Sequence, residues 1–419
     1  MIALPSRALS IEAIAAASTL GVIVGPFKLP EAVWAVFGAL SLCVLGLLPW
    51  SEALTAIGKG HDVYLFLIGM MVASELARKE GLFDYMAALA AKLARGSQKN
   101  LFFLIYCVGT IVTVFLSNDA TAVVLTPAVI TVARVVKAKQ PLPYLYICAF
   151  VANAASFALP ISNPANLVIF QDRMPSLLSW LDRFALPTLL SVSLTYLSLR
   201  LMHREELTEA IMADVALPQL STAGKATGFG IAAMAITILS ASECDMPLGL
   251  TTFCAGLTLF LTICMLKKKV LASHLSEISW SVLPLVAGLF ILVEGLQRTG
   301  VVDSLAGILM SMSKNIPAHA GWLSGVVTAL ACNLINNLPA GLIAGSALAT
   351  AHATPSAASA ILVGLDLGPN FSLTGSLATL LWLTTLRRSG IEVTAWSFLK
   401  LGMVVTLPAL VAALLSVAL

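Results

Sequence analysis

The sequence predicts an all-α polytopic membrane protein with about ten transmembrane segments arranged as two inverted repeats. Its composition, with 59% hydrophobic and 11% charged residues, is not that of a soluble globular protein. Apolar runs that reach the length of a membrane-spanning helix, about 20 residues, recur along the chain. Polar interruptions also fall at corresponding places in the two halves, which indicates an internal duplication.

The first repeat is predicted over residues 1–202 and begins with three apolar spans. Leu9–Gly25, Glu31–Trp50 and His61–Ala77 have the composition of membrane-spanning helices. Tyr85–Arg95 is amphipathic and is expected to lie along the membrane interface. We expect the spans to form the scaffold of the repeat.

A polar tip interrupts the next apolar block, 99–139. The tip reads Ser117-Asn118-Asp119, and each arm beside it is about 16 residues long, which is marginal for crossing a membrane alone. Unpaired backbone is tolerated at membrane depth only where protein or water covers it. The block is therefore predicted to be a re-entrant hairpin whose tip is buried in protein.

A second interruption lies in the segment 144–172. Pro160 and Pro164 flank Ser162 and Asn163 there, and two prolines disfavour a continuous helix because each removes a backbone donor and restricts the preceding residue. The segment is predicted to be a broken helix.

The second half shows the same order of elements. Residues 203–225 form the most polar connection and are predicted to be the linker between repeats. The second repeat is predicted over residues 226–419, with a hairpin at 318–352 and a broken helix at 355–388.

Landmarks of the two halves correspond at nearly constant offsets. The tip Asn118-Asp119 matches Asn336-Asn337. The other matched pairs are Gly69 with Gly288, Glu75 with Glu294, Gly81 with Gly300, Asp84 with Asp303, Asn153 with Asp366, Asn163 with Ser376, and Asn166 with Thr379. Helix breaks at corresponding positions of two repeats indicate a transporter binding site near the membrane midplane.

Basic residues predict the orientation. The linker and Lys267-Lys268-Lys269 flank one helical pair and so lie on the same side, which collects most of the 24 lysines and arginines. The positive-inside rule makes this side cytoplasmic. Both termini are then expected outside, the hairpins are expected to enter from opposite faces, and the chain is expected to be a multi-pass protein of the cell inner membrane.

The interruptions carry hydroxyl, amide and carboxyl side chains but no Lys, Arg or His. Such oxygens suit a neutral polyhydroxylated solute or a cation, although helix N-termini could also hold an anion. The candidate substrate-binding residues are Ser117, Asn118, Thr121, Ser162, Asn163, Asn166, Asn333, Asn336, Asn337, Thr374, Ser376 and Thr379.

Asp119 and Asp366 are the carboxylates deepest in the apolar pattern. A charged side chain at the membrane centre costs about 2.5 to 3.5 kcal/mol on insertion scales, so such residues are commonly functional and often carry protons. Both are predicted to couple proton movement to transport.

Simpler interpretations exist for these residues. Asn118 and Asp119 could only cap the second hairpin arm, and Asp366 could only stabilise a turn made by neighbouring Gly and Pro residues. The histidines have no ligand spacing, so no metal is expected. The chain has no phosphate-binding GxxxxGK motif and no nucleophile motif, so neither a cofactor nor an enzymatic activity is expected.

Three stretches carry a resemblance to a known family. They are Phe115–Pro127, Ile161–Asn166, and Asp366–Asn370 followed by Thr374–Trp382. Together they resemble the arsenite and antimonite efflux permeases, the ArsB-type arsenical pump membrane proteins of the ion-transporter superfamily.

The resemblance implies export of As(OH)3 or Sb(OH)3 in exchange for protons, sometimes with a soluble arsenite-stimulated ATPase. It also allows a homodimer, and no nucleic-acid partner is expected. A neutral triol suits Ser, Thr and Asn ligands. One departure is that Asn336-Asn337 has no acid at the place of Asp119.

Two other functions remain open. A sodium-coupled carrier of a small carboxylate, or a sodium/proton antiporter of the same superfamily, could use the same breaks for sodium and the helix N-termini for the anion. A membrane scaffold or channel subunit would show passive flux that ignores the ion gradient.

Overall fold

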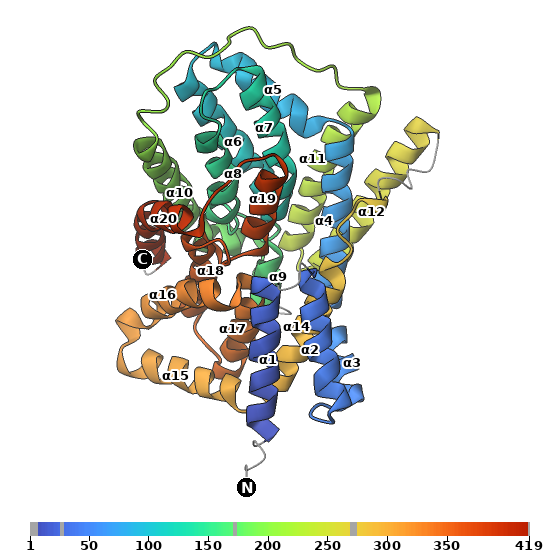
Figure 1. Ribbon diagram of the computed structural model, residues 1–419. Helices are drawn as coiled ribbons and strands as arrows, with labels where there is room; N and C mark the ends of the chain where they lie inside the picture. The colour runs from blue at the N-terminus through green and yellow to red at the C-terminus, as the bar shows by residue number, and fades with distance from the viewer. Residues whose placement is uncertain (1–6, 26–28, 171–173, 269–274, 418–419) are drawn as a thin grey trace.

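The computed structural model describes residues 7–25, 29–170, 174–268 and 275–417, and no strand occurs among them (Figure 1). The first half contains α1 (Arg7–Val24), α2 (Glu31–Val44), α3 (Trp50–Lys59), α4 (His61–Lys79), α5 (Leu82–Ala94), α6 (Gln98–Phe115), the π-helical segment η2 (Ala120–Leu125), α7 (Thr126–Val135), α8 (Leu142–Ala154), α9 (Pro164–Phe170) and α10 (Leu177–Met202).

The second half contains α11 (Thr222–Glu243), α12 (Leu248–Lys267), α14 (Val282–Gln297), α15 (Val301–Asn315), α16 (Pro317–Ile335), α17 (Asn337–Ala351), α18 (Pro355–Leu367), the 3-10 segment η4 (Gly368–Phe371), α19 (Leu377–Arg388) and α20 (Ala395–Val417). Of the sequence-based features, Lys269 and the last two residues of the broken helix 144–172 lie outside the described residues.

The predicted fold class is confirmed. Six described helices are long and apolar enough to cross a membrane, or up to eight if each of two bent helix pairs forms one span. Length and composition thus support six to eight of the predicted segments, and four shorter apolar helices accompany them. The hairpin of α6 and α7 lies toward one end of the molecule and that of α16 and α17 toward the other (Figure 1), as an inverted arrangement requires.

Two element boundaries were predicted wrongly. The span Glu31–Trp50 ends at Val44, because the chain turns at Gly46 with φ +65°, a conformation that glycine tolerates, and Pro49 then precedes α3. The linker ends earlier than predicted, because the Ser221 hydroxyl accepts a hydrogen bond from the Gly224 amide and caps α11.

The two halves pack reciprocally. α4 lies along α12, and α14 lies along α2. A Cβ atom at Gly69 would lie 2.3 Å from the Thr252 carbonyl oxygen, and one at the corresponding Gly288 would lie 2.7 Å from the Ala35 carbonyl carbon. Only glycine permits these approaches. The matched glycines Gly69 and Gly288 therefore allow equivalent helix pairs, α4 with α12 and α14 with α2, to pack closely.

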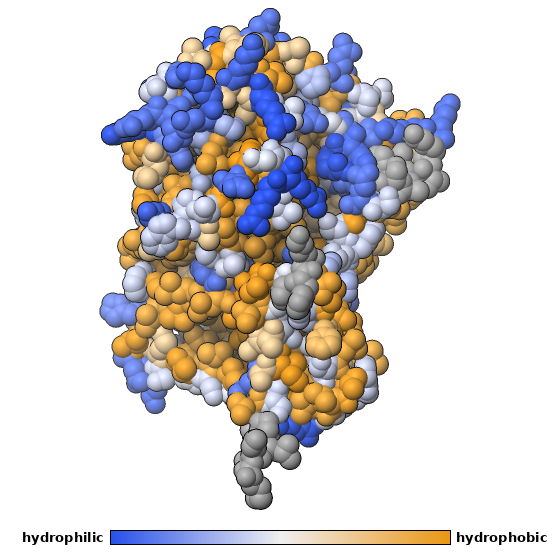
Figure 2. All heavy atoms as spheres, viewed as in Figure 1, coloured by the Kyte–Doolittle hydropathy of each residue, from blue (hydrophilic) through white to orange (hydrophobic). Residues whose placement is uncertain are grey.

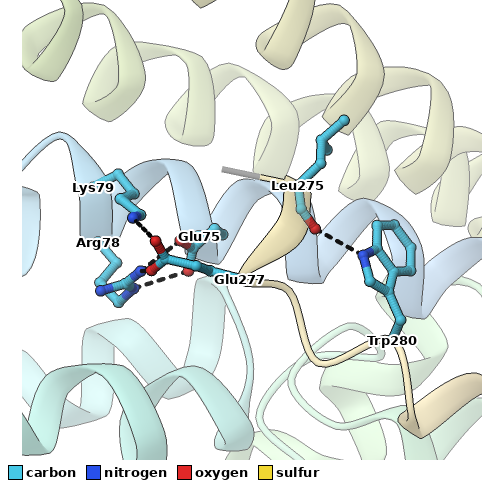
Figure 3. Close-up of polar contacts among 6 residues, drawn as sticks. All are labelled: Glu75, Arg78, Lys79, Leu275, Glu277 and Trp280. Carbon is cyan, nitrogen blue, oxygen red and sulfur yellow. Dashed lines mark hydrogen bonds and ion pairs between the residues drawn. The ribbon is translucent and has the colours of Figure 1, made fainter. Parts of the chain in front are cut away.

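Ion pairs brace both ends of these crossings. The Glu277 carboxylate, in the segment before α14, accepts from Arg78 and Lys79 at the end of α4, and Arg78 also donates to Glu75 (Figure 3). Beside it, the Trp280 indole donates to the Leu275 carbonyl. This ion-pair cluster fixes the connection to α4.

The opposite end carries a related arrangement. Arg298 pairs with Glu52 of α3, and Lys59 Nζ lies 2.6 Å from Glu294 Oε2. Arg298 and Glu294 occupy the positions that correspond to Lys79 and Glu75. Charged residues at the end of α4 therefore pair with the segment before α14, and charged residues at the end of α14 pair with α3, the helix before α4.

The linker crosses the open end of the first hairpin. The Ile211 amide donates to the Gly96 carbonyl and the Met212 amide to the Val136 carbonyl, each at 3.0 Å. Figure 2 shows hydrophilic side chains gathered at the end of the molecule where the linker and α5 lie in Figure 1, whereas hydrophobic side chains cover much of the remainder. The first hairpin thus enters from the linker side.

Candidate functional site

The first hairpin tip rests on the break in the first broken helix. The Asn118 backbone amide donates to the Ser162 carbonyl at 3.1 Å, and the Ser162 hydroxyl donates to the Val114 carbonyl at 3.0 Å. Ser117, Asn118 and Ser162 are all buried. These bonds explain how a backbone without helical pairing can exist at membrane depth.

Some of the tip side chains act as caps. The Ser117 hydroxyl accepts from the Ala120 amide at 3.2 Å, and the Asn118 side-chain oxygen accepts from the Asp119 amide at 3.0 Å. The Thr121 hydroxyl lies 2.8 Å from that of Thr113. Ser117 therefore acts as the cap of the second arm, whereas the simpler interpretation had assigned this role to Asn118 and Asp119.

Asp119 does not take part in this capping. The residue as a whole is partly exposed, and no described residue forms a hydrogen bond or ion pair with its carboxylate. The π-helical segment η2 follows directly, and such segments often occur at functional sites. The Asp119 carboxylate is thus left available to a proton or a solute.

The second tip has a similar backbone contact. The Asn337 backbone amide donates to the Gly375 carbonyl at 3.0 Å. Gly375 corresponds to Ser162, whereas Asn337 corresponds to Asp119, so the donor is shifted by one residue from Asn118. Asn336 has φ +69° and donates from its side chain to the Thr374 carbonyl at 3.3 Å. The ψ of 154° at Asn336 places it outside the left-handed helical region, in a conformation that residues other than glycine adopt only with strain. The two tips therefore have similar backbone contacts, shifted by one residue.

A denser side-chain network surrounds the second tip. The Asn333 side chain donates to the Gly368 carbonyl at 3.0 Å and accepts from the Ser372 hydroxyl at 2.6 Å. The Thr374 hydroxyl donates to the Asn333 carbonyl at 3.1 Å. Amide and hydroxyl groups thus take the place that a carboxylate has at the first tip.

The two broken helices meet through buried side chains. Asn163 Nδ2 donates to Asp366 Oδ1 at 2.8 Å, and Asn153 Nδ2 donates to Asn370 Oδ1 at 2.9 Å. Asp366, Asn153 and Asn370 are completely buried. The halves are therefore joined by polar contacts in the interior of the protein, where such contacts are costly unless satisfied.

Three oxygen atoms at this junction have no partner among the described residues. They are Asp366 Oδ2, Asn153 Oδ1 and Asn166 Oδ1. All three are acceptors, so what would satisfy them is a proton, a hydrogen-bond donor or a cation. Among the described residues, no group of three His, Cys, Asp or Glu side chains could hold a metal ion.

Helix N-termini face the breaks in both halves. Asn163 Oδ1 accepts from the Ala165 amide at 3.0 Å at the start of α9, and the Ser376 hydroxyl accepts from the Thr379 amide at 3.2 Å at the start of α19. Asn166 is held by its own break, since its side chain donates to the Ser156 carbonyl at 3.0 Å. The N-terminal dipoles favour negative charge there.

The predicted binding residues therefore fall into two groups joined at one junction. The first group is Ser117, Asn118, Thr121, Ser162 and Asn166, the second is Asn333, Asn336, Asn337, Thr374, Ser376 and Thr379, and Asn163 and Asp366 connect the broken helices.

Asn153, Asn370 and Ser372 join this network but were not predicted as binding residues. Asn153 lies in an apolar run with no helix breaker beside it, and its correspondence with Asp366 was the one signal that could have found it.

A cleft of about 980 Å³ lies close to these groups but contains none of the predicted site residues. It opens between α14 and α17, with Leu167 of α9 and Leu342 of α17 in its lining. Leu167 directly follows Asn166, so the cleft reaches α9, the second part of the first broken helix.

Comparison with known proteins places the chain in a family. The family model described as "Citrate transporter" (CitMHS) matches residues 19–368. An arsenical pump membrane protein of Escherichia coli is 24% identical over 366 residues, covering 84% of this chain and 85% of that protein. An uncharacterized transporter of Mycobacterium tuberculosis is 26% identical over 405 residues, covering 92% of each.

The YdaH transporter of Alcanivorax borkumensis has a similar fold, with a TM-score of 0.56 and 15% identity over 87% of this chain and 86% of that one. The resemblance predicted from the three sequence stretches is confirmed by relatives named as arsenical pumps. The family match spans most of the sequence, and the chain belongs to the citrate transporter family of multi-pass membrane transporters.

Proposed function

We propose that the protein is a secondary active transporter that exports a trivalent metalloid, As(OH)3 or Sb(OH)3, across the inner membrane in exchange for protons. The observation that carries this proposal is the chemistry of the breaks. Their described residues present hydroxyl and amide groups and two carboxylates, with no Lys, Arg or His among them.

A neutral triol fits such a site. Its hydroxyl groups can donate to and accept from Asn and Thr side chains, and its binding needs no balancing positive charge. A di- or tricarboxylate would need two or three charges balanced, and the described residues of the breaks offer for this the partial positive charges of helix N-termini, those of α9, α17 and α19. The relatives named as arsenical pumps support the same cargo.

The buried carboxyl group supports proton coupling. Asp366 is completely buried, its Oδ1 accepts from Asn163, and its Oδ2 has no partner among the described residues. An ionised carboxylate in that position is costly unless paired. We propose that Asp366 and Asp119 each release a proton to the inside when the metalloid enters the binding site. Each then takes up a proton from the outside before the empty site returns to the inside.

The proposal includes an arrangement in the membrane. The stretches before and after the linker are the two repeats, the linker is cytoplasmic, and both termini are outside. A soluble ATPase partner and a homodimer belong to the same proposal through the family resemblance alone.

A second candidate is a sodium-coupled carrier of a small carboxylate. The observation that favours it is the description of the matching family as citrate transporters. In that case sodium would bind the unpartnered oxygens at the junction and thereby compensate part of the cargo's charge.

Inverted membrane vesicles separate the two candidates. The metalloid proposal predicts that vesicles accumulate arsenite or antimonite when their interior is acidic, with or without sodium. The alternative predicts sodium-dependent movement of citrate and no response to arsenite. If neither cargo responds to either gradient, and flux is passive, both transport proposals are wrong.

A further inference from the structure

The cleft between α14 and α17 lies beside α9, which begins at the break of the first broken helix, and is also lined by α17, which begins at the second hairpin tip. Leu167 follows Asn166 directly, and Leu342 lies little more than one helical turn, about 7 Å, beyond Asn337 along α17. The cleft thus comes within one or two turns of both groups of polar residues without containing them.

The cleft opens on the side opposite the linker. Its lining includes Asp245 and Met246, in the connection between α11 and α12. α11 starts at the linker and runs from Thr222 to Glu243, a length of about 33 Å that is sufficient to cross the hydrocarbon core. The connection at its far end therefore lies on the opposite face.

The charged groups in the cleft are only partly compensated, because the Asp245 side chain has no hydrogen bond or ion pair among the described residues. Lys59 pairs with Glu294, and Asp62 Oδ1 accepts from the Gly249 amide at 2.9 Å. The lining therefore keeps the negative charges of Asp62 and Asp245, which disfavour an anion but do not repel a neutral solute in transit.

The volume of the cleft is far larger than that of the proposed metalloid cargo. About 980 Å³ holds on the order of tens of water molecules, whereas As(OH)3 has only four heavy atoms. A small-molecule site encloses its ligand closely, and this cleft would leave such a cargo surrounded by water.

One polar contact crosses the seam of the cleft. Gln297 at the end of α14 donates from Nε2 to the Ser346 hydroxyl of α17 at 3.1 Å, and both residues line the cleft. We propose that this cleft is the passage through which cargo moves between the polar breaks and the face opposite the linker, and that the Gln297–Ser346 seam lies in its wall, about one helical turn further from the second tip than Leu342.

This inference rests on the proposed transport function but not on the identity of the cargo. Its first test is the side from which a cysteine at the seam can be reached. Ser346→Cys and Gln219→Cys, in the linker, are treated with a membrane-impermeant thiol reagent in intact cells and in inverted vesicles. Labelling is measured at each residue by mass spectrometry, so the native cysteines do not interfere.

The expected result is opposite sidedness. The Ser346→Cys thiol reacts at least ten times faster from the face opposite the linker, and the Gln219→Cys thiol reacts faster from the linker side. Equal rates from both faces, or no reaction of the Ser346→Cys thiol, would overturn the passage. This outcome does not depend on which cargo, if any, is transported.

The second test asks whether an obstacle in the cleft stops transport. Ser346→Cys and the matched control Thr350→Cys are modified after folding with a bulky or a methyl-sized thiol reagent, and uptake of arsenite and of citrate is compared with that of identically treated wild type. Thr350 lies one turn further along α17, is exposed and does not line the cleft.

The bulky adduct at residue 346 is expected to reduce transport at least tenfold, the methyl-sized adduct less, and either adduct at residue 350 by less than twofold. Undiminished transport after complete modification of the Ser346→Cys thiol would contradict the proposal. If arsenite does not move but citrate does and is blocked, the passage stands and the metalloid function fails.

Discussion

The two hairpin tips have similar backbone contacts, shifted by one residue, and different side-chain chemistry. In each tip the backbone amide of an asparagine donates to a backbone carbonyl of the neighbouring break, Asn118 to Ser162 at 3.1 Å and Asn337 to Gly375 at 3.0 Å. The first tip adds a carboxylate, Asp119. The second adds the amide side chain of Asn336 and a network of hydroxyl groups.

The broken helices show the reverse distribution. The first carries the amides Asn153 and Asn163, whereas the second carries the carboxyl group of Asp366. The difference teaches that backbone hydrogen bonds maintain the repeated fold while the side chains diverge. Each half thereby contributes one acid and one group of amides, arranged crosswise, and this is the asymmetry that proton exchange for a neutral cargo would use.

The largest effect is expected at Asp366. Asp366→Asn keeps the size of the side chain and an oxygen that can accept from Asn163, but it cannot exchange a proton. Proton-driven arsenite uptake into inverted vesicles should fall at least tenfold, which corresponds to about 1.4 kcal/mol. Uptake at the wild-type rate with normal expression would remove Asp366 from the proton path.

A smaller loss is expected at the first tip. Asp119→Asn gives the first tip the Asn-Asn sequence of the second, and the change leaves the Ser117 and Asn118 caps in place. Because Asp119 as a whole is partly exposed and its carboxylate has no partner among the described residues, the fold should tolerate the change. Uptake should decrease less than in Asp366→Asn and should become less sensitive to pH, as measured across a series of pH gradients.

Equivalent helix caps should differ in their effect on stability. Asn163 caps α9 and also holds Asp366, whereas Ser376 caps only α19. In purified protein, Asn163→Ala should lower the free energy of unfolding by about 1–3 kcal/mol because a buried carboxylate oxygen loses its donor. Ser376→Ala should cost about 1 kcal/mol. Equal losses would indicate that Asn163 acts only as a cap.

The smallest effect is expected at the ion pairs of the two ends. Hydrogen bonds from Lys79 and Arg78 hold the pKa of Glu277 below its ordinary value of 4.5. The stabilisation is therefore complete above pH 4.5 and is lost as the pH falls through the lower pKa of the folded protein.

The thermal unfolding temperature of Glu277→Gln should lie slightly below that of wild type at pH 7, and the gap should close in acid and in high salt, because exposed ion pairs contribute little. Glu52→Gln, at the opposite end, is the matched variant. A large, salt-independent loss in only one of them would show that the two ends are not braced alike.

Much of the fold was predictable because membrane-spanning helices and their breaks depend on local sequence. The tip at Ser117-Asn118-Asp119 and the prolines at 160 and 164 identified both interruptions of the first half. The end of α2 was missed because Gly46 and Pro49 stop the helix inside an apolar run that hydropathy alone would extend.

The junction of the broken helices could be predicted only in part. Asn163 and Asp366 were identified as candidates, but their contact at 2.8 Å depends on how the halves pack. The Asn153–Asn370 contact and the cleft behind α9 and α17 arise from the same packing. Such contacts join residues far apart in the sequence, and no local pattern encodes them.

Proton movement driven by metalloid tests the central claim most directly. Purified protein is placed in liposomes with a pH-sensitive dye inside and no imposed gradient, and arsenite is added outside. Wild type should move protons outward as arsenite enters, and a variant with both Asp119→Asn and Asp366→Asn should move none. Proton flux that is absent in wild type, or unchanged in the double variant, would contradict the account.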